Sequence, residues 1–443
     1  MKKTIIGLLM LCIALPGVSQ ERFTVEEAVN YGLKNHVDVK NAIVKRQDTE
    51  MDIQETKQGG LPQVNGQFAY TYNAIVPTQL IDAQNFNPEA APGETVKFKF
   101  GVPWGGQAGL SVNQLIYDAS FFIGLRAADT YRQLADQTIV QTEITVAENI
   151  TKAYYSVLVA EERSKILSLN INRIDSLLRT TEALYEQGFA EQLDVDRLNV
   201  QKNNLNAELS NVRNLINLSY KLLKFQMGMD VRSSVILTNT LEELETAAKA
   251  TATFSEISPE DRIEYQLLQT NRTLLGLNME RYSKSNLPSV MFSGTLGAGH
   301  SNTRFNPFER WFGSSALTLS AQIPIYDSGL RKTRVERQRL NILQLDNQAE
   351  MLKNTFELQN DQAITNLTNG METLEIQKRN VTLAENVLRV GKIKYQQGVG
   401  SNIEVINAEN DLRQAQTNYF AALYDVLVAK VDYDKAQGNL LKD

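Results

Sequence analysis

The 443-residue chain has little of what enzymes and metal sites are built from, with one cysteine and two histidines. Cys12 lies close to the N-terminus, and neither His36 nor His300 has a second ligand at metal-binding spacing. We interpret both histidines as incidental surface or loop residues. Phosphate-binding loops, dinucleotide fingerprints and nucleophile elbows are also missing from the sequence. These absences argue against an enzyme and lead us to expect no cofactor and no metal ion.

Long apolar runs and an excess of positive charge are lacking as well. After the N-terminal segment, no stretch approaches the roughly 18 consecutive apolar residues that a membrane-spanning helix needs. The mean hydropathy of −0.29 argues against a bundle of membrane-spanning helices. The net charge of −6 offers no basic stripe for phosphates, so we expect no nucleic acid partner.

Residues 1–19 have the pattern of a secretory signal peptide. Lys2 and Lys3 form its positive start, residues 5–15 form an apolar core too short to span a bilayer, and small residues at 17–19 form a cleavage site. The single cysteine is part of this segment, so the mature chain has no thiol. We therefore expect an exported protein.

Proline is absent from residues 104–258 and from residues 325–443, although the chain contains ten prolines. Because a proline inside a helix costs about 3 kcal/mol, these tracts predict long helices over 120–185 and 329–395, each roughly 100 Å long. The last helix carries apolar residues three or four positions apart, namely Ala408, Leu412, Ala415, Tyr419, Ala422, Val426, Ala429 and Tyr433. A period near 3.5 predicts coiled-coil packing.

The sequence contains one unit twice. The Tyr-Asp pair at 117–118 recurs at 326–327, and the run at 185–188 recurs at 395–398. The matched positions keep their order and a nearly constant spacing, which chance similarity between helical tracts does not explain. We divide the chain into a signal peptide (1–19), a first repeat (20–228), a linker or equatorial segment (229–257) and a second repeat (258–443). Each repeat is expected to contain a helix, two strands joined by a loop, and a long helical hairpin.

Four segments alternate between apolar and polar residues with a period of two, which is typical of strands with one apolar face. They cover residues 63–73, 107–116, 290–296 and 317–325. Each has about the ten residues of a tilted strand that crosses a bilayer. Trp104, Trp311 and Phe312 fall in the connecting loops, where an interfacial aromatic girdle is expected. A half-buried sheet of a soluble sandwich is the alternative, but no remaining segment would cover so many aromatic outward faces.

Four strands do not close a barrel, because the smallest outer-membrane barrels have about eight and an open sheet edge is not tolerated in hydrocarbon. The chain must therefore oligomerise. Two copies would enclose an interior just filled by side chains, whereas three would enclose a lumen. The polar faces of the strands fit a wet lumen better than a packed one.

The turns between the paired long helices carry the remaining signals. Gly188 and Gly398 each follow a helix where a left-handed C-cap is favoured. Ser401 and Glu404 form a capping-box pattern at the start of the last helix, and Asp194 is the matching acid in the first repeat. Interaction with the helix dipole, worth about 0.3–1 kcal/mol, accounts for each acid alone. In a symmetric oligomer the same acids would form rings of negative charge that favour cations.

Together these features resemble the TolC-type outer-membrane efflux proteins, or outer membrane factors, over essentially the whole mature chain. The resemblance is carried by the duplicated unit, the Tyr-Asp pairs at 117–118 and 326–327, and the paired tips at 188–195 and 398–405. It implies a mainly α fold with four transmembrane strands per chain. It also implies a homotrimer with a twelve-strand β-barrel in the outer membrane of a Gram-negative cell and a helical coiled-coil tunnel across the periplasm.

The resemblance also implies partners and site residues. A periplasmic adaptor protein would dock on the tips, and an inner-membrane pump of the resistance-nodulation-division or ABC type would supply energy to this passive export duct in outer-membrane lipid. The implied adaptor contacts are Gly188, Phe189, Gly398, Val399 and Ser401. The implied periplasmic constriction contains Asp194, Glu404 and Asn407. Asn407 and Gly400 differ from the acidic and basic residues of the best-known member, so Glu404, with Asp194 nearby, is expected to form the acidic ring.

A non-channel periplasmic coiled-coil scaffold or adaptor, with its strands in a soluble β domain, is the alternative function. Membrane fractionation separates the two. A channel is expected to remain with the outer membrane through salt and carbonate washes and to need detergent for release, because its strands would face lipid. Release by salt or carbonate alone would favour the scaffold.

Overall fold

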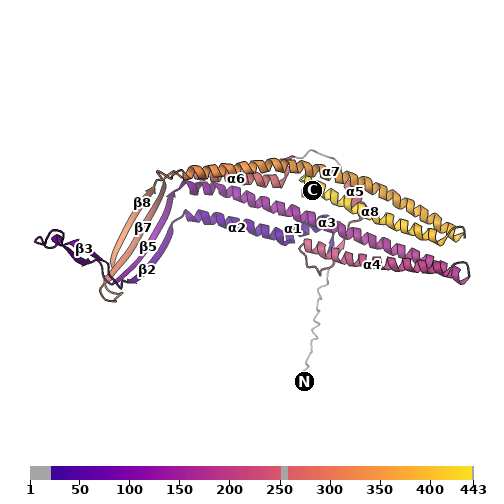
Figure 1. Cartoon of the computed structure of the whole chain (residues 1–443), viewed down its shortest axis with the longest axis horizontal. Coiled ribbons are helices and arrows are strands. Elements are labelled where there is room, and N and C mark those ends of the chain that lie inside the picture. The colour runs from indigo at the N-terminus through magenta and orange to yellow at the C-terminus, as the bar shows by residue number, and fades with distance from the viewer. Residues whose placement is uncertain (1–20, 251–257, 442–443) are drawn as a thin grey trace, which may run out of the picture. The chain divides into compact units, whose positions relative to one another are not determined.

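The computed structural model describes residues 21–250 and 258–441, and the predicted signal peptide lies outside these residues. Helices and strands follow one another twice in a similar order (Figure 1). The first series runs α1 (Val25–Asn35), α2 (Val37–Gly59), β2 (Gln63–Tyr72), β5 (Trp104–Tyr117), α3 (Ala119–Glu186) and α4 (Gln192–Gln226). The second runs α6 (Ile263–Ser283), β7 (Ser289–Asn302), β8 (Phe312–Gln322), α7 (Leu330–Gln396) and α8 (Asn402–Ala436). The mainly α fold with four such strands is as predicted, whereas the repeat boundaries stay a prediction.

The two longest helices lie where proline is absent. Helix α3 has 68 residues and α7 has 67, and their ends agree closely with the ranges expected from the sequence. Within the described part of the chain, no helix contains an apolar stretch that would carry it across a bilayer. The remaining short elements are β1 (Glu21–Phe23), β6 (Val235–Leu237), α5 (Leu241–Ala250) and the 3₁₀ turns at Ala83–Asn85 and Pro259–Asp261.

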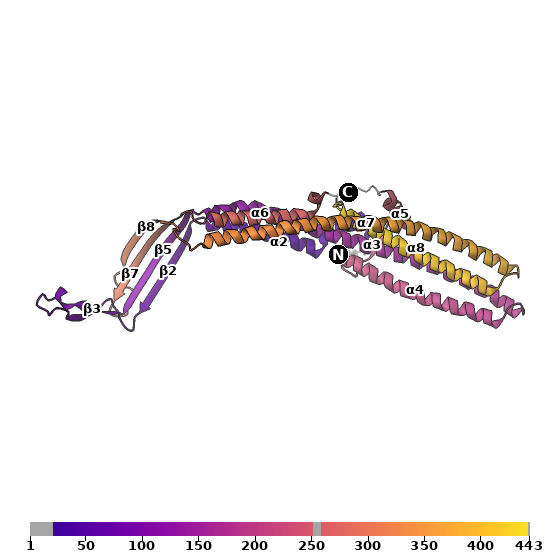
Figure 2. The ribbon, with the colours of Figure 1, turned by 45° about the horizontal axis from the view of Figure 1, so that its top comes forward.

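Contacts divide the chain into two compact units, each with segments from both series. Unit 1 comprises residues up to 45, 135–268 and 348–443, and unit 2 comprises 46–134 and 269–347. In unit 1, α4 and α8 run beside the C-terminal parts of α3 and α7 (Figure 2). Unit 2 contains the four-stranded sheet and the adjoining parts of α2, α3, α6 and α7.

Unit 1 is held together by two apolar clusters. The first surrounds Tyr154, which is fully buried and donates its hydroxyl hydrogen to the carbonyl of Phe23 at 2.9 Å. The second, nearer the tips, includes Leu198, Val405 and Leu412. The apolar positions predicted for the coiled-coil face of α8 are all buried except Tyr419, which packs partly buried against the first cluster. The sequence period therefore identified the packed face of this helix.

Two glycines end the helical hairpins in the same way. Gly228 follows α4 with φ of +69°, and a Cβ at this position would lie 2.7 Å from the carbonyl oxygen of Asn35. Gly438 follows α8 with φ of +70°, and its Cβ would lie 3.3 Å from the carbonyl oxygen of Asp261. Left-handed backbone favours glycine, and the close approach at Gly228 leaves no room for a side chain. The end of each hairpin thus packs against the residues that lead into α2 or α6.

Helices of unit 2 are joined by ion pairs. The Arg132 guanidinium binds both carboxylate oxygens of Glu50, at 2.7 and 2.9 Å, and links α3 to α2. Arg272 and Asp346, 2.6 Å apart, link α6 to α7. Hydrogen bonding to Arg132 holds the pKa of Glu50 below its ordinary value. Such accessible pairs add little stability each, so their main effect here is to align neighbouring helices.

The four long strands form one antiparallel sheet in the order β2-β5-β7-β8. Residues that pair across the four strands form rows. One face carries a row formed by Val64, Val112, Gly294 and Leu317, and the other face carries the adjacent row formed by Asn65, Ser111, Thr295 and Ala316. The predicted division into an apolar and a polar face is therefore present. All of β8 is exposed, and within the described residues the outer edges of β2 and β8 have no partner strand.

A second hairpin interrupts the first series. The connection between β2 and β5, which the sequence predicts as a loop, contains β3 (Thr78–Asp82) and β4 (Thr95–Lys99). These strands pair antiparallel over their whole length. The prediction missed them because each has only five residues and lies beside the prolines and asparagines that are typical of turns.

The interpretation of both histidines as incidental surface or loop residues is wrong for His300, which is buried on a strand. His36 does lie in the connection between α1 and α2, but it is buried there. His36 is 9% exposed, and its Nδ1 accepts a hydrogen bond from the N–H of Asp38 at 3.1 Å, in the first turn of α2. His300 is 3% exposed and lies on β7. Among the described residues, no three histidine, cysteine or acidic side chains are grouped so as to hold a metal ion.

Helix α5 is anchored by a buried carboxylate. Glu245 accepts hydrogen bonds from Lys249 at 2.7 Å, Lys378 at 3.2 Å and the hydroxyl of Tyr419 at 3.2 Å. Burial alone would raise the pKa of Glu245, but the two ammonium groups outweigh it and hold the pKa below 4.5. Burial and the neighbouring carboxylate raise the pKa of Tyr419 to about 12. One carboxylate thereby joins α5 to α7 and α8.

Because folding lowers the pKa of Glu245, we expect the free energy of unfolding to fall in acid. Because the unfolded chain binds this proton more readily, the contribution is complete above pH 4.5 and is lost as the pH falls through the lower folded-state pKa. Glu245→Gln should lower the melting temperature at neutral pH and flatten its fall in acid, as measured by circular dichroism. The exposed Glu242→Gln on the same helix is the control. An unchanged acid profile in Glu245→Gln would contradict this role.

Candidate functional site

The two tips between the long helices are built on left-handed glycines. Gly188 has φ of +79° and Gly398 has φ of +74°, and each donates its N–H to a tyrosine carbonyl three residues earlier, at 2.9 and 3.0 Å. The predicted glycine C-caps are therefore confirmed. Because the chain turns directly after these caps, the next side chains project outward. Phe189 is 79% exposed and Val399 is 78% exposed.

The helix after the second tip is better capped at its N-terminus than the helix after the first tip. The Ser401 hydroxyl accepts a hydrogen bond from the N–H of Glu404 at 3.3 Å, whereas Glu191 makes no side-chain cap on α4. The predicted capping box is only half formed, because the Glu404 carboxylate lines a pocket instead of returning to Ser401. At Gly400, a Cβ would lie 2.9 Å from the Cβ of Lys394, so this turn is tight enough to require glycine.

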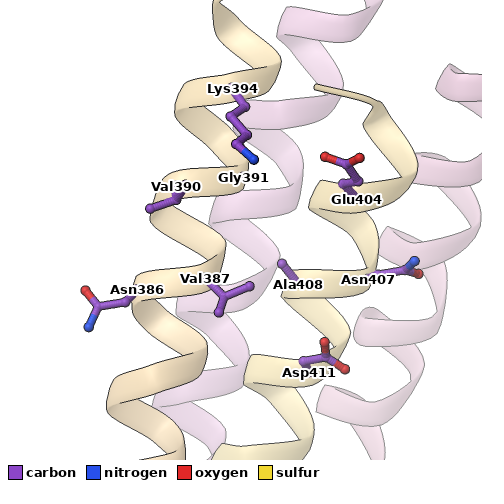
Figure 3. A pocket seen from close by; sticks show the side chains of 9 residues that line it. All are labelled: Asn386, Val387, Val390, Gly391, Lys394, Glu404, Asn407, Ala408 and Asp411. Carbon is purple, nitrogen blue, oxygen red and sulfur yellow. The ribbon is translucent and has the colours of Figure 1, made fainter. Parts of the chain in front are cut away.

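A pocket of about 540 Å³ lies between the ends of α7 and α8 (Figure 3). Its lining residues are Asn386, Val387, Val390, Gly391, Lys394, Glu404, Asn407, Ala408 and Asp411. The Lys394 ammonium and the Glu404 carboxylate approach it from opposite helices. The structure thus brings together Glu404 and Asn407, which the sequence singled out, and adds Lys394 and Asp411. Glu404 and Asp411 are seven residues apart, a spacing that places both on one face of the helix. From this spacing, Asp411 could have been predicted as a second acid of the site.

Asp194 does not line this pocket. Its carboxylate lies 3.8 Å from the guanidinium of Arg197 on the same helix. Its backbone carbonyl accepts a hydrogen bond from the Asn402 side chain at 3.1 Å, and this bond joins the first tip to the second. The grouping of Asp194 with Glu404 in one acidic ring stays a prediction for an assembly of several copies.

A buried carboxylate that the sequence did not single out ties three helices together near the tips. Glu409 on α8 is 4% exposed and contacts Lys392 of α7 at 2.9 Å and Arg173 of α3 at 3.4 Å. Beside it, the Asn170 amide donates to Gln416 at 3.1 Å. A buried charge is costly unless it is paired, so each cation holds its helix in place against α8. No local sequence pattern indicates this cluster, because its members come from distant parts of the chain.

Aromatic residues gather on the apolar face of the sheet, at the end remote from α2. Trp104 packs against Tyr72 in a tilted arrangement with ring centres 4.4 Å apart and meets Phe305 edge to face at 4.9 Å. Trp311 stacks on His300 at 5.5 Å, and its indole N–H donates to a backbone carbonyl. A Cβ on the intervening residue 106 would collide with Trp311, so glycine makes room for this ring. We call these five residues, together with Tyr70, the aromatic cluster.

The register separates the third predicted girdle residue from the other two. Phe312 pairs with Gly299, one position from His300, and so lies on the polar face of the sheet. Trp104 and Trp311 belong to the aromatic cluster on the other face. The Nδ1 of His300 lies 3.1 Å from the carbonyl of Arg310, and this contact holds the β7–β8 connection over the cluster.

A family model described as outer membrane efflux protein matches residues 29–228 and 281–439. The outer membrane protein TolC of Escherichia coli is 20% identical over 401 residues, which cover 88% of this chain and 76% of TolC. The proteases secretion protein PrtF of Dickeya chrysanthemi is 19% identical over 445 residues, which cover 98% of this chain and 92% of PrtF. The outer membrane channel CmeC of Campylobacter jejuni has a similar fold, with a TM-score of 0.72 at 14% identity, covering 94% of this chain and 86% of CmeC.

Because Glu409 holds α8 against α3 and α7, we expect its replacement by glutamine to loosen the tips. Glu409→Gln keeps the shape of the side chain but leaves Lys392 and Arg173 without their shared charge, and should cost about 1–3 kcal/mol because these cations are partly accessible. Hydrogen exchange of the second tip is expected to accelerate. The exposed Glu385→Gln on α7 is the matched control, and equal exchange in both variants would rule out this role.

Proposed function

This chain belongs to the outer membrane efflux protein family, and from that premise we propose that it is the passive exit duct of a tripartite efflux or type I secretion system. The protein is located in the outer membrane. The observation that carries the proposal is the four-stranded sheet with one apolar face, one polar face and two unpaired edges. The relatives are named as outer-membrane, channel or secretion proteins, not as enzymes.

The unpaired sheet edges support a homotrimer. In hydrocarbon, every backbone N–H and C=O must find a partner within protein, so β8 of one copy has to pair with β2 of the next. Three copies would bring twelve strands together and close a barrel around a lumen. Because successive side chains of a strand lie on opposite faces of the sheet, the row that contains Leu317 would face lipid and the row that contains Ser111 would face water.

The helices support the same assembly. Four apolar side chains on α4 are 47–64% exposed and follow one another at helical spacing, namely Leu215, Leu218, Leu222 and Phe225. Apolar residues three or four positions apart form one stripe along a helix. A neighbouring copy would cover this stripe and complete a helical tunnel.

The tips are the proposed docking surface for a periplasmic adaptor. Phe189 and Val399 are large apolar side chains that project from rigid glycine turns, and such residues are typical anchors of a protein interface. Gly188, Gly398 and Ser401 hold the turns that display them. An inner-membrane pump of the resistance-nodulation-division or ABC type would supply the energy through that adaptor, because the described residues include no nucleotide-binding loop.

The proposed constriction contains Glu404, Asn407 and Asp194, with Asp411 next along α8. A threefold axis would repeat each carboxylate around the tunnel, and a ring of carboxylates attracts cations. Lys394 lies across the pocket from Glu404 and would moderate this charge. Asn407 contributes polarity without charge.

The acidic ring is tested by single-channel recording. Glu404→Gln is expected to lower the preference for cations and to weaken block by multivalent cations, because each copy loses one carboxylate at the constriction. Glu357→Gln, which removes an exposed carboxylate from the middle of α7, should leave both properties unchanged. Unaltered selectivity and block in Glu404→Gln would exclude it from the ring. A purified protein that forms no conducting pore would exclude the channel itself.

A further inference from the structure

The β3–β4 hairpin has one apolar face. The register places Ile81 opposite Val96, and two residues away Phe98 lies on the same side of the ribbon. Phe86 stacks on Phe98 with ring centres 6.1 Å apart, and Phe100 meets the edge of Phe98 at 5.0 Å. The three phenylalanines and Val96 are each 44–63% exposed. Among the described residues, the ring contacts of these phenylalanines are made with one another, within the hairpin.

The opposite face of the hairpin carries both of its cations. Lys97 and Lys99 alternate with the apolar residues of β4, and Leu80 is the one large apolar residue beside them. In the described residues, neither lysine makes an ion pair with a carboxylate. The carboxylates of Asp82 and Glu94, by contrast, already accept hydrogen bonds from backbone N–H groups at the far end of the hairpin, at 3.0 and 3.3 Å. The two ammonium groups are therefore available to external anions.

The hairpin is attached at the end of the sheet that carries the aromatic cluster. Two backbone bonds close its base, from the N–H of Asn73 to the carbonyl of Pro103 at 2.7 Å and from the N–H of Phe100 to the carbonyl of Pro77 at 2.9 Å. Figure 1 shows it beyond the end of β2 that is remote from α2. Since the long helices follow the other end of the strands, this end is the one directed away from the cell interior.

We propose that the β3–β4 hairpin is a lipid-binding ribbon that lies on the outer leaflet of the outer membrane. Phe98, Val96 and Ile81 enter the interfacial region, where aromatic side chains are favoured. Lys97 and Lys99 have stems long enough to bring their ammonium groups to anionic lipid phosphates. The occupant of the apolar face is thus a membrane surface, and charge complementarity favours an anionic one. This inference rests on the proposed crossing of the membrane by the sheet and is independent of adaptor docking and export.

Single-cysteine labelling tests the proposal, because Cys12 is the sole cysteine and lies in the predicted signal peptide. Phe98→Cys and the adjacent Lys97→Cys carry the same fluorescent label on opposite faces. Each is placed in vesicles of phosphatidylethanolamine and phosphatidylglycerol. The label at position 98 is expected to be quenched several-fold more by a nitroxide lipid than by aqueous iodide, and the label at position 97 is expected to show the reverse preference.

Leu317→Cys, in the middle of β8, reports on membrane insertion of the sheet and should be quenched by the nitroxide lipid. If position 317 responds while position 98 responds only to iodide, the ribbon projects into water and the proposal is overturned without loss of the channel. If position 98 is shielded from both quenchers, protein covers it and the proposal is likewise overturned. Failure of the label at position 317 to respond to the nitroxide lipid overturns both the membrane crossing by the sheet and the lipid-binding ribbon.

A second variant tests the role of charge. Replacing both Lys97 and Lys99 with glutamine in Phe98→Cys should reduce quenching of the label at position 98 by the nitroxide lipid, and no reduction would overturn the role of charge.

Discussion

Unpaired backbone groups at the two edges of the β2-β5-β7-β8 sheet are the constraint on which the proposed assembly depends. Water can satisfy such groups, but hydrocarbon cannot, so in the proposed assembly other copies of the chain would close the sheet. The antiparallel register already assigns an apolar row and a polar row to each strand. Closure would therefore create a lipid-facing surface and a wet lumen at the same time.

The two units meet different physical demands. Unit 1 has apolar clusters that bury one face of each long helix, with Tyr154 and Glu245 adding directed hydrogen bonds. In unit 2, accessible ion pairs such as Arg132 with Glu50 align neighbouring helices with each other. Buried contacts supply most of the folding free energy, whereas accessible ion pairs chiefly select which helices lie next to each other.

The tips combine rigidity with exposed chemistry. Left-handed glycines fix the turns, and the buried Glu409 holds α8 against α3 and α7. On this frame, Glu404 and Asp411 stay accessible on one side of α8, and Phe189 and Val399 project from the ends. The proposed constriction and the proposed docking surface would therefore lie close together, because the same few turns position both.

The sequence by itself determined the long helices, the four strands, their apolar faces and the glycine caps, because proline content and residue period act through the local backbone. Tertiary structure alone decided that Lys394 faces Glu404 across a pocket, that His300 is buried under Trp311, and that five-residue segments pair as β3 and β4. It also set Phe312 on the face opposite the tryptophans. These features depend on strand register and on which helices are neighbours, and contacts between residues far apart in the chain fix both.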